Sequence, residues 1–318
     1  MLNAFTLNNG QLCQIDLGKG SPDSDHPIWI DAVAPSDEER QWVEQTYHLT
    51  LPKPAHLRDI EASARFYEEN GALHLRSDFL LGKDHSSHSI AVAFVLFDGV
   101  LFSVHEEDLP VFHQLRMRTH AQSGDVENSS DVLIDLYSLD VEYSADALEG
   151  VYADLGKVSG KVLSSQLSND DAAGVLASIA RAEHLNSRIR RNVMDTRRAV
   201  SFLMRSRLLS PTQMEESTQV MHDIESLDGH TAFLFDKINF LMSVNVGFIN
   251  LNQNKIVRLF SVSSVALLPP VLVASIYGMN FEHMPELKWL LGYPFALLLM
   301  ALSVLIPFWI FYRKGWLK

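Results

Sequence analysis

Residues Leu259–Phe281 read LFSVSSVALLPPVLVASIYGMNF, and residues Trp289–Tyr312 read WLLGYPFALLLMALSVLIPFWIFY. Neither run contains an Asp, Glu, Lys, Arg or His residue. About 20 apolar residues in a helix cross the hydrocarbon core of a bilayer, and each run is at least that long. The connection, residues 282–288, is short enough to be a tight turn. We therefore expect a hairpin of two transmembrane helices, over about residues 256–278 and 290–312.

The basic residues around these runs predict the orientation of the hairpin. Lys255 and Arg258 precede the first run, and Arg313 and Lys314 follow the second, whereas the connection holds only Lys288. Short loops rich in Lys and Arg stay in the cytoplasm. We expect both chain ends in the cytoplasm, the connection outside, and everything before residue 255 to be cytoplasmic.

The rest of the chain is acidic. The last sixty residues hold two acidic and four basic side chains, so the preceding residues hold 37 acidic and 22 basic ones, a net charge of −15. Such a surface repels nucleic acid and concentrates cations, although solubility alone explains it equally well. The single cysteine, Cys13, excludes a disulfide framework within the chain. The first residues lack the basic start and apolar core of a cleavable signal peptide.

Residues 1–125 have the pattern of a mixed α/β domain. Asn8-Asn9-Gly10, Asn70-Gly71 and Asp98-Gly99 each separate two strand-like runs, which predicts three hairpins. Ser36 and Glu39 have the spacing of a capping box at a helix start. Residues 28–33 are expected to form a strand, and residues 109–121 a helix that covers one face of the sheet.

From residue 126 to 254 the pattern changes to long helices, so the predicted fold class is α+β. The first helix has a polar side that carries Glu142, Asp146, Glu149 and Asp154. This side is either an acidic wall facing a cation reservoir or an ordinary solvated face. A second helical stretch, residues 171–209, is rich in arginines that we interpret as a salt-bridge lacing with acidic neighbours: Arg181, Arg188, Arg190, Arg191, Arg197 and Arg198.

The third helix is expected to run from Thr212 to Tyr277, into the first span. A continuous helix of this length is roughly 100 Å long at about 1.5 Å per residue. A lone helix of that length cannot bury its apolar side, and two spans cannot enclose a pore. Both facts predict several copies around an axis.

Several motifs resemble the CorA magnesium channels, most closely the enterobacterial type, over nearly the whole chain. In the C-terminal region they are Tyr277-Gly278-Met279-Asn280-Phe281, Met284-Pro285-Glu286-Leu287, Gly292-Tyr293-Pro294 and Lys314-Gly315-Trp316-Leu317. Elsewhere they are Asp59-Ile60-Glu61-Ala62-Ser63-Ala64-Arg65-Phe66, Met194-Asp195-Thr196, Asp223-Ile224-Glu225-Ser226 and Gly247-Phe248-Ile249-Asn250.

The resemblance implies a funnel-shaped homopentamer in the bacterial inner membrane, with the first span of each subunit lining the pore. It implies Mg²⁺ as the transported ion, with Co²⁺ and Ni²⁺ also carried, and Mg²⁺ as a regulatory ligand. It implies no enzyme activity and no cofactor, and the acidic body excludes a nucleic-acid partner. Gly278, Met279 and Asn280 correspond to the outer selectivity filter, and Asn254 to the cytoplasmic polar ring.

Steps of three and four residues from Asn254 define the predicted pore face of the first span. Its members are Asn254, Val257, Phe260 (or Ser261), Ser264, Leu268, Val271 and Ser275. In the alternative, Phe260, Leu268 and Val271 face lipid or the second span, which periodicity cannot exclude. Pro269-Pro270 is either a packed kink or a place where the span bends.

Three acidic residues complete the predicted ion sites. Mg²⁺ releases its water reluctantly, so neutral oxygens suit an entry site that holds the hydrated ion. Glu282 and Glu286 in the connection are expected to attract cations. Asp223 is the candidate for a regulatory metal ligand, with simple solvation as the alternative.

The transported ion requires an energy source, and the chain has no nucleotide-binding motif. We expect the membrane potential to drive uptake. Two other functions remain open from the sequence: a ZntB-type zinc transporter, which shares Gly-Met-Asn, and a membrane-anchored cation sensor without transport. A metal-dependent hydrolase is disfavoured, because the acids and histidines do not cluster at ligand spacing.

Overall fold

The computed structural model describes residues 1–8, 10–15, 26–52, 65–84, 86–121, 126–163, 169–279, 284–285 and 289–315. By its internal contacts the chain divides into two compact units. The body unit comprises residues 1–164 and 175–242, and the apolar-helix unit comprises residues 165–174 and 243–318. The three domains expected from the sequence, 1–125, 126–254 and 255–318, stay a prediction.

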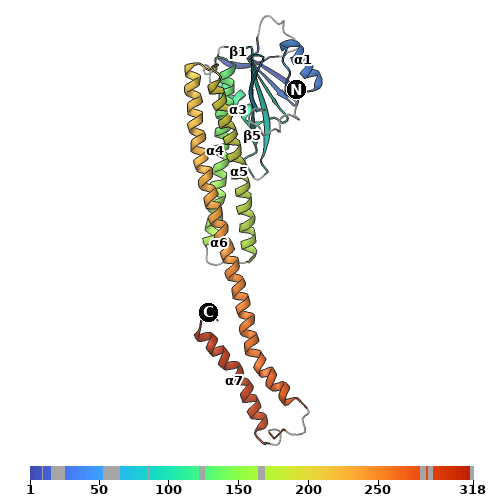
Figure 1. Ribbon diagram of the computed structural model, residues 1–318, viewed down its shortest axis with the longest axis vertical. Helices are drawn as coiled ribbons and strands as arrows, with labels where there is room; N and C mark the ends of the chain where they lie inside the picture. Colours follow the sequence, from blue (N-terminus) through green and yellow to red (C-terminus); the bar gives the residue numbers. More distant parts are fainter. Residues whose placement is uncertain are drawn as a thin grey trace. The chain divides into compact units, whose positions relative to one another are not determined.

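The strands and the helices that cover them come first along the chain (Figure 1). They are β1 Leu2–Asn8, β2 Gln11–Ile15, β3 Trp29–Val33, α1 Asp37–Tyr47, β4 Phe66–Glu69, β5 Ala72–Leu81, β6 His88–Phe97, β7 Val100–His105 and α3 Pro110–Ala121. The long helices follow as α4 Ser129–Leu163, α5 Asn169–Arg205, α6 Pro211–Tyr277 and α7 Gly292–Arg313.

The strands form one seven-stranded sheet in the order β2-β1-β3-β7-β6-β5-β4. The three predicted hairpins are confirmed, since β1 pairs with β2, β4 with β5 and β6 with β7, all antiparallel. Asn70 and Asp98 have φ angles of 51° and 49°, and each precedes a glycine with positive φ. Two successive left-handed residues fit the right-handed twist of the flanking strands, which is why Asn-Gly and Asp-Gly mark these turns.

The central pair of the sheet, β3 and β7, is parallel. Since parallel strands need a crossover, this pairing brings residues about seventy positions apart into register, such as Asp31 opposite Ser103. Alternate side chains then point to opposite faces. Ile30 and Phe102 enter an apolar cluster with Val43 of α1 on one face, while Trp29 packs against Phe112 of α3 on the other.

Helix α1 begins as the sequence predicts. Ser36 accepts a hydrogen bond from the Glu39 amide, and the Glu39 carboxylate accepts one from the Ser36 amide, which completes the capping box. The Met1 amine lies 2.8 Å from the same carboxylate. The start of α1 is thereby tied to the start of β1.

Helices α4, α5 and the first half of α6 run side by side in the body unit (Figure 1). Their shared core is mostly apolar, with Leu133, Leu155, Ile189, Ile224 and Leu234 among its buried members. Helix α5 ends at Arg205 rather than at the expected Leu209. The Ser206 hydroxyl and amide both bond to the Leu203 carbonyl, and Arg207 has a φ of 61°, so the backbone leaves the helix there.

Candidate functional site

Two helices are long and apolar enough to cross a membrane, α6 and α7. Only 11% of the most apolar segment of α6 and 6% of that of α7 are buried within the chain. A core helix of a soluble protein is mostly buried, so these helices do not serve as a core for this chain. Their apolar surface instead requires a bilayer or other protein.

The predicted pore residues all lie on one exposed face of α6. Phe260, Leu268, Val271 and Val257 are 72%, 66%, 63% and 62% exposed, and Asn254, Ser264 and Ser275 are exposed too. Whether this face lines a pore stays a prediction, because a single chain contains no pore.

The buried face of α6 is not the face that carries the predicted pore residues. Val262 and Ala266 are 2% and 0% exposed, and Pro269, Val273 and Tyr277 continue their spacing as half-buried positions. In Figure 1, α7 returns alongside this part of α6, and its small residues Gly292 and Ala296 are buried. Positions two apart on a helix differ by about 200°, so Ser264, Leu268 and Val271 lie roughly opposite the buried face. Contact with the second span therefore does not account for Phe260, Leu268 and Val271.

Gly278 closes α6 in a crowded position. Its amide donates to the Ala274 carbonyl at 3.0 Å, and the Met279 amide donates to the Ile276 carbonyl at 3.2 Å. A Cβ on Gly278 would lie 3.1 Å from the Ala274 oxygen. A side chain at Gly278 would therefore require a shift of a few tenths of an ångström at this turn.

The other filter and loop residues are placed only in part. Met279 is 48% exposed beside Gly278. Asn280, Glu282 and Glu286 lie outside the described residues. Their roles stay predictions.

No described group of three or more His, Cys, Asp or Glu side chains is arranged to hold a metal ion. Asp223 is exposed on α6 and accepts a hydrogen bond from Gln219, one turn before it, at 3.1 Å. Asp223 belongs to no described group of three such side chains. A metal at Asp223 would need ligands from elsewhere, such as another copy of the chain.

The polar side of α4 differs from the acidic wall that one interpretation offered. Three of its four acids pair within the chain: Glu142 with Arg118 at 3.4 Å, Asp146 with Lys83 at 2.6 Å and Asp154 with Lys157 at 2.9 Å. All three pairs are exposed, so each is weak.

The arginines of α5 do not form the salt-bridge lacing expected from the sequence. Among the described residues, only Arg190 of the six predicted arginines forms an ion pair, with Asp228 of α6 at 3.1 Å. Arg191, Arg197 and Arg198 are exposed. The face that α5 turns to solvent is basic in an otherwise acidic body.

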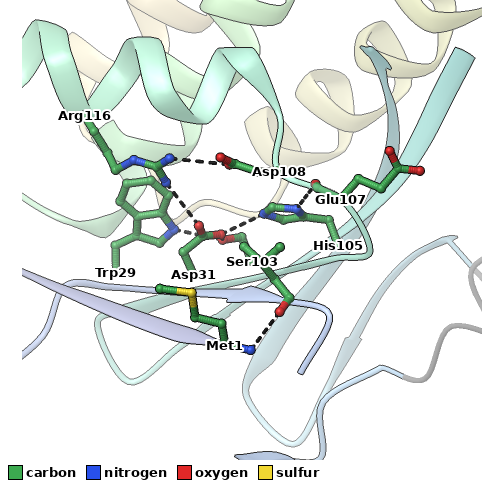
Figure 2. Close-up of polar contacts among 9 residues, drawn as sticks. Met1, Trp29, Asp31, Ser103, His105, Glu107, Asp108 and Arg116 are labelled. Atoms are coloured by element: carbon green, nitrogen blue, oxygen red, sulfur yellow. Dashed lines mark hydrogen bonds and ion pairs between the residues drawn. The ribbon is translucent and has the colours of Figure 1, made fainter. Parts of the chain in front are cut away.

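A buried polar network that the sequence does not reveal joins β3, β7 and α3 (Figure 2). The Asp31 carboxylate is fully buried and accepts from Ser103 Oγ at 2.7 Å, His105 Nε2 at 2.9 Å and Arg116 at 3.3 Å. Trp29 Nε1 donates to the Ser103 hydroxyl at 2.9 Å. A nucleophilic serine would bond to the histidine and face a cleft; Ser103 instead donates to Asp31 and is 0% exposed. The network ties the parallel strands to the helix above them.

The contacts of His105 favour its protonated form. Its Nδ1 lies 2.6 Å from the Glu107 carbonyl and its Nε2 faces the Asp31 carboxylate. Both partners are acceptors, and a protonated ring donates from both nitrogens. Burial alone would lower the pKa of His105, but the hydrogen bond to Asp31 and its charge outweigh burial and raise it.

A second buried carboxyl lies between α4 and α5. Asp140 accepts from Asn192 Nδ2 at 3.0 and 3.1 Å and from Thr196 Oγ1 at 2.9 Å. Burial raises the pKa of Asp140 to about 7, since these neutral donors do not replace bulk water for the charged form. Nearby Asp195, paired with Arg65 at 2.7 Å, has a pKa that burial also raises.

Comparison with known proteins connects these observations. A sequence model of the family described as CorA-like Mg²⁺ transporter protein matches residues 24–313. The magnesium transport protein CorA of Escherichia coli (strain K12) is 43% identical over 319 residues, covering 100% of both chains. That of Sodalis glossinidius (strain morsitans) is 42% identical with the same coverage.

A solved structure shares the fold. The complete structure of the CorA magnesium transporter from Methanocaldococcus jannaschii superposes with a TM-score of 0.81 at 16% identity, over 99% of this chain and 98% of that chain. At this identity the likeness concerns architecture: an α/β domain, long helices and a C-terminal apolar pair.

Proposed function

This chain belongs to the CorA-like Mg²⁺ transporter family, and we propose that it takes up Mg²⁺ through a pore formed by the first spans of several copies. The observation that carries this proposal is full-length similarity to magnesium transport proteins, joined to two apolar helices that the chain leaves exposed. It is a membrane protein. We place it in the bacterial inner membrane with both ends in the cytoplasm, as the basic residues beside the spans favour.

The exposed face of α6 is the proposed pore lining. Asn254 and Ser264 supply polar side chains toward its start, Ser275 toward its end, and Leu268 and Val271 an apolar stretch between. Rings of apolar side chains gate channels by excluding water. The assembly is a homopentamer in this proposal, as the family resemblance implies.

The end of α6 is the proposed entry filter. Mg²⁺ keeps its waters in most protein sites, so a site that selects it must bind the hydrated ion. The Asn280 amide and the carbonyls of Gly278 and Met279 would accept hydrogen bonds from those waters. Glu282 and Glu286 would raise the local cation concentration. Co²⁺ and Ni²⁺ are proposed to pass by the same route.

The membrane potential is the proposed energy source. A divalent cation gains about 4.6 kcal/mol per 100 mV on moving inward, twice the value for one charge. This suffices for roughly a two-thousandfold accumulation. A pathway driven in this way must be able to close. Closure by Mg²⁺ bound as a regulatory ligand at Asp223 stays a prediction.

Ion flux into proteoliposomes tests the proposal. Vesicles carrying the full chain and an internal Mg²⁺ indicator are given an inside-negative potassium diffusion potential. We expect Mg²⁺ entry that rises with the potential and stops when the potential is abolished. Entry of Zn²⁺ but not Mg²⁺ would favour the zinc transporter, and no flux of either ion would favour a sensor without transport.

A further inference from the structure

The body unit carries a basic edge on α5 beside α6. Arg190 and Arg197 are seven residues apart, about two turns, so they share one edge of α5. Arg190 Nε lies 3.1 Å from Asp228 Oδ1 of α6, which shows that this edge borders α6. Arg197 is exposed and forms no ion pair with any described residue.

An acidic edge borders the other side of α6. On α4, Glu149 lies one turn before Tyr152, whose hydroxyl bonds to His230 Nδ1 of α6 at 2.9 Å. Asp223 is seven residues before His230, so it lies on this same side of α6. Unlike Glu142, neither Glu149 nor Asp223 forms an ion pair with a described residue.

The two edges lie on opposite sides of α6. Asp228 and His230 are two residues apart, which turns them about 200° around the helix axis. Between them, on the solvent side, α6 exposes Phe233 to 58%. Within one chain, the α6 helix therefore separates Arg197 from Asp223.

The two charges nevertheless stand at the same height along α6. Arg190 contacts Asp228, and Ser201 contacts Met221 at 3.7 Å. Since α5 and α6 are antiparallel, Arg197 lies between these contacts, at the level of residues 221 to 228 of α6. Asp223 falls within that interval.

We propose that Arg197 of one copy docks against Asp223 of the next copy around a ring. This inference rests on the proposed function, because a pore requires several copies. A ring is built from heterologous contacts, in which two different patches of one subunit meet the opposite patches of its neighbours. A basic edge and an acidic edge at one height, on opposite sides of one helix, meet that requirement.

This pairing gives Asp223 a partner that differs from the regulatory metal predicted from the sequence. It also explains why α5 carries unpaired arginines in an acidic body: they meet acids of the neighbour rather than acids of their own chain. Complementary charges of this kind fix register and partner more than they add affinity. The contact sets how neighbouring copies align.

Cysteine cross-linking tests the proximity. With Cys13→Ser as background, Arg197→Cys and Asp223→Cys are introduced together in the full chain and treated with a short bismaleimide in detergent, because an Arg–Asp ion pair holds its Cα atoms farther apart than the about 7 Å that a disulfide allows. We expect a ladder of covalent multimers on a denaturing gel, since α6 blocks the link inside one chain. Neither single variant should form the ladder. An assembled protein with both thiols reactive but no ladder would overturn the proposal.

Charge exchange tests the pairing, with native mass spectrometry as the readout. Arg197→Asp and Asp223→Arg should each weaken assembly about threefold per interface, as exposed ion pairs do, and the double variant should recover it. Arg191→Asp, an exposed arginine on another side of α5, is the matched control and should have no effect. Failure of the double variant to recover assembly would assign Asp223 to a cation such as Mg²⁺, or Arg197 to a soluble anion, and would overturn the pairing.

The two proposals fail separately. Mg²⁺ flux from an assembled protein that gives no cross-link would remove only the Arg197–Asp223 contact. A monomeric chain without flux would remove the pore itself.

Discussion

The body unit and the apolar-helix unit use apolar side chains in opposite ways. In the body, Trp29, Phe79, Phe102 and Tyr137 are at most 1% exposed. In the apolar-helix unit, large apolar side chains such as Phe260, Leu268 and Trp309 are at least 60% exposed. The body therefore builds its own core, whereas the apolar surface of the other unit requires a bilayer or other protein. Substitutions should affect folding in the first and conduction in the second.

The largest effect is expected in the core of the body. Phe102→Ala should lower the free energy of unfolding by about 3–5 kcal/mol, through lost burial and the cavity left beside Tyr47. Hydrogen exchange of the full chain in detergent, followed by mass spectrometry, resolves the two units. Exchange should increase in β7 and its neighbours and stay unchanged in α7. Equal loss of protection in α7 would contradict the view that the body builds a core of its own.

The buried carboxyl Asp140 should make the body sensitive to pH. Its pKa in the folded chain, about 7, exceeds that of an unfolded aspartate, so the folded state binds the proton more tightly. This contribution is complete below about pH 4 and is lost as pH rises to about 7, on the order of 4 kcal/mol. Buried Asp195 shifts in the same direction.

Thermal melts of the full chain between pH 5 and 8 measure this contribution. Asp140→Asn should flatten the decline, because its amide carries no titrating proton. Glu149→Gln, an exposed acid of the same helix, is the control and should leave the decline unchanged. An unchanged slope in Asp140→Asn would show that the carboxyl stays charged throughout.

In the apolar-helix unit, Asn280→Ala should reduce Mg²⁺ uptake by about 100-fold, equivalent to about 2.7 kcal/mol, because an oxygen ligand for the hydrated ion is lost. We expect assembly, measured by native mass spectrometry, to be unchanged. Asn280→Gln retains the amide and serves as the comparison. Uptake at the normal rate in an assembled Asn280→Ala protein would remove this residue from the mechanism.

The sequence predicted features whose causes are local. Asn70-Gly71 and Asp98-Gly99 specify turns through their own backbone angles. Ser36 and Glu39 lie three residues apart in the capping box. The two spans are recognised by the absence of charged residues over each run. All three signals need only neighbouring residues, so a single chain suffices to see them.

The Asp31 network had no such signal. Its partners come from β7 and α3, more than seventy residues away, and only the parallel pairing of β3 with β7 brings them together. Likewise, the arginines of α5 suggested pairing by composition, but composition does not fix which face of the helix they occupy. The predicted pore face is exposed, but so are Leu259 and Leu267 on other sides of the same span. Exposure therefore does not separate a pore face from a lipid face, and the pore lining stays a prediction.

The smallest effect is expected at the apolar stretch of the first span. If Leu268 lines the pore, Leu268→Asn eases wetting of the narrow part and should raise the leak of Mg²⁺ by about tenfold, equivalent to about 1.4 kcal/mol. If it faces lipid, the buried amide should lower the melting temperature and leave the current of each channel unchanged. Single-channel recording beside a thermal melt separates these outcomes. Leu267→Asn is the matched control, because Leu267 is 59% exposed but lies about 100° away around the helix. Equal leak from both variants would show that wetting does not depend on the predicted pore face.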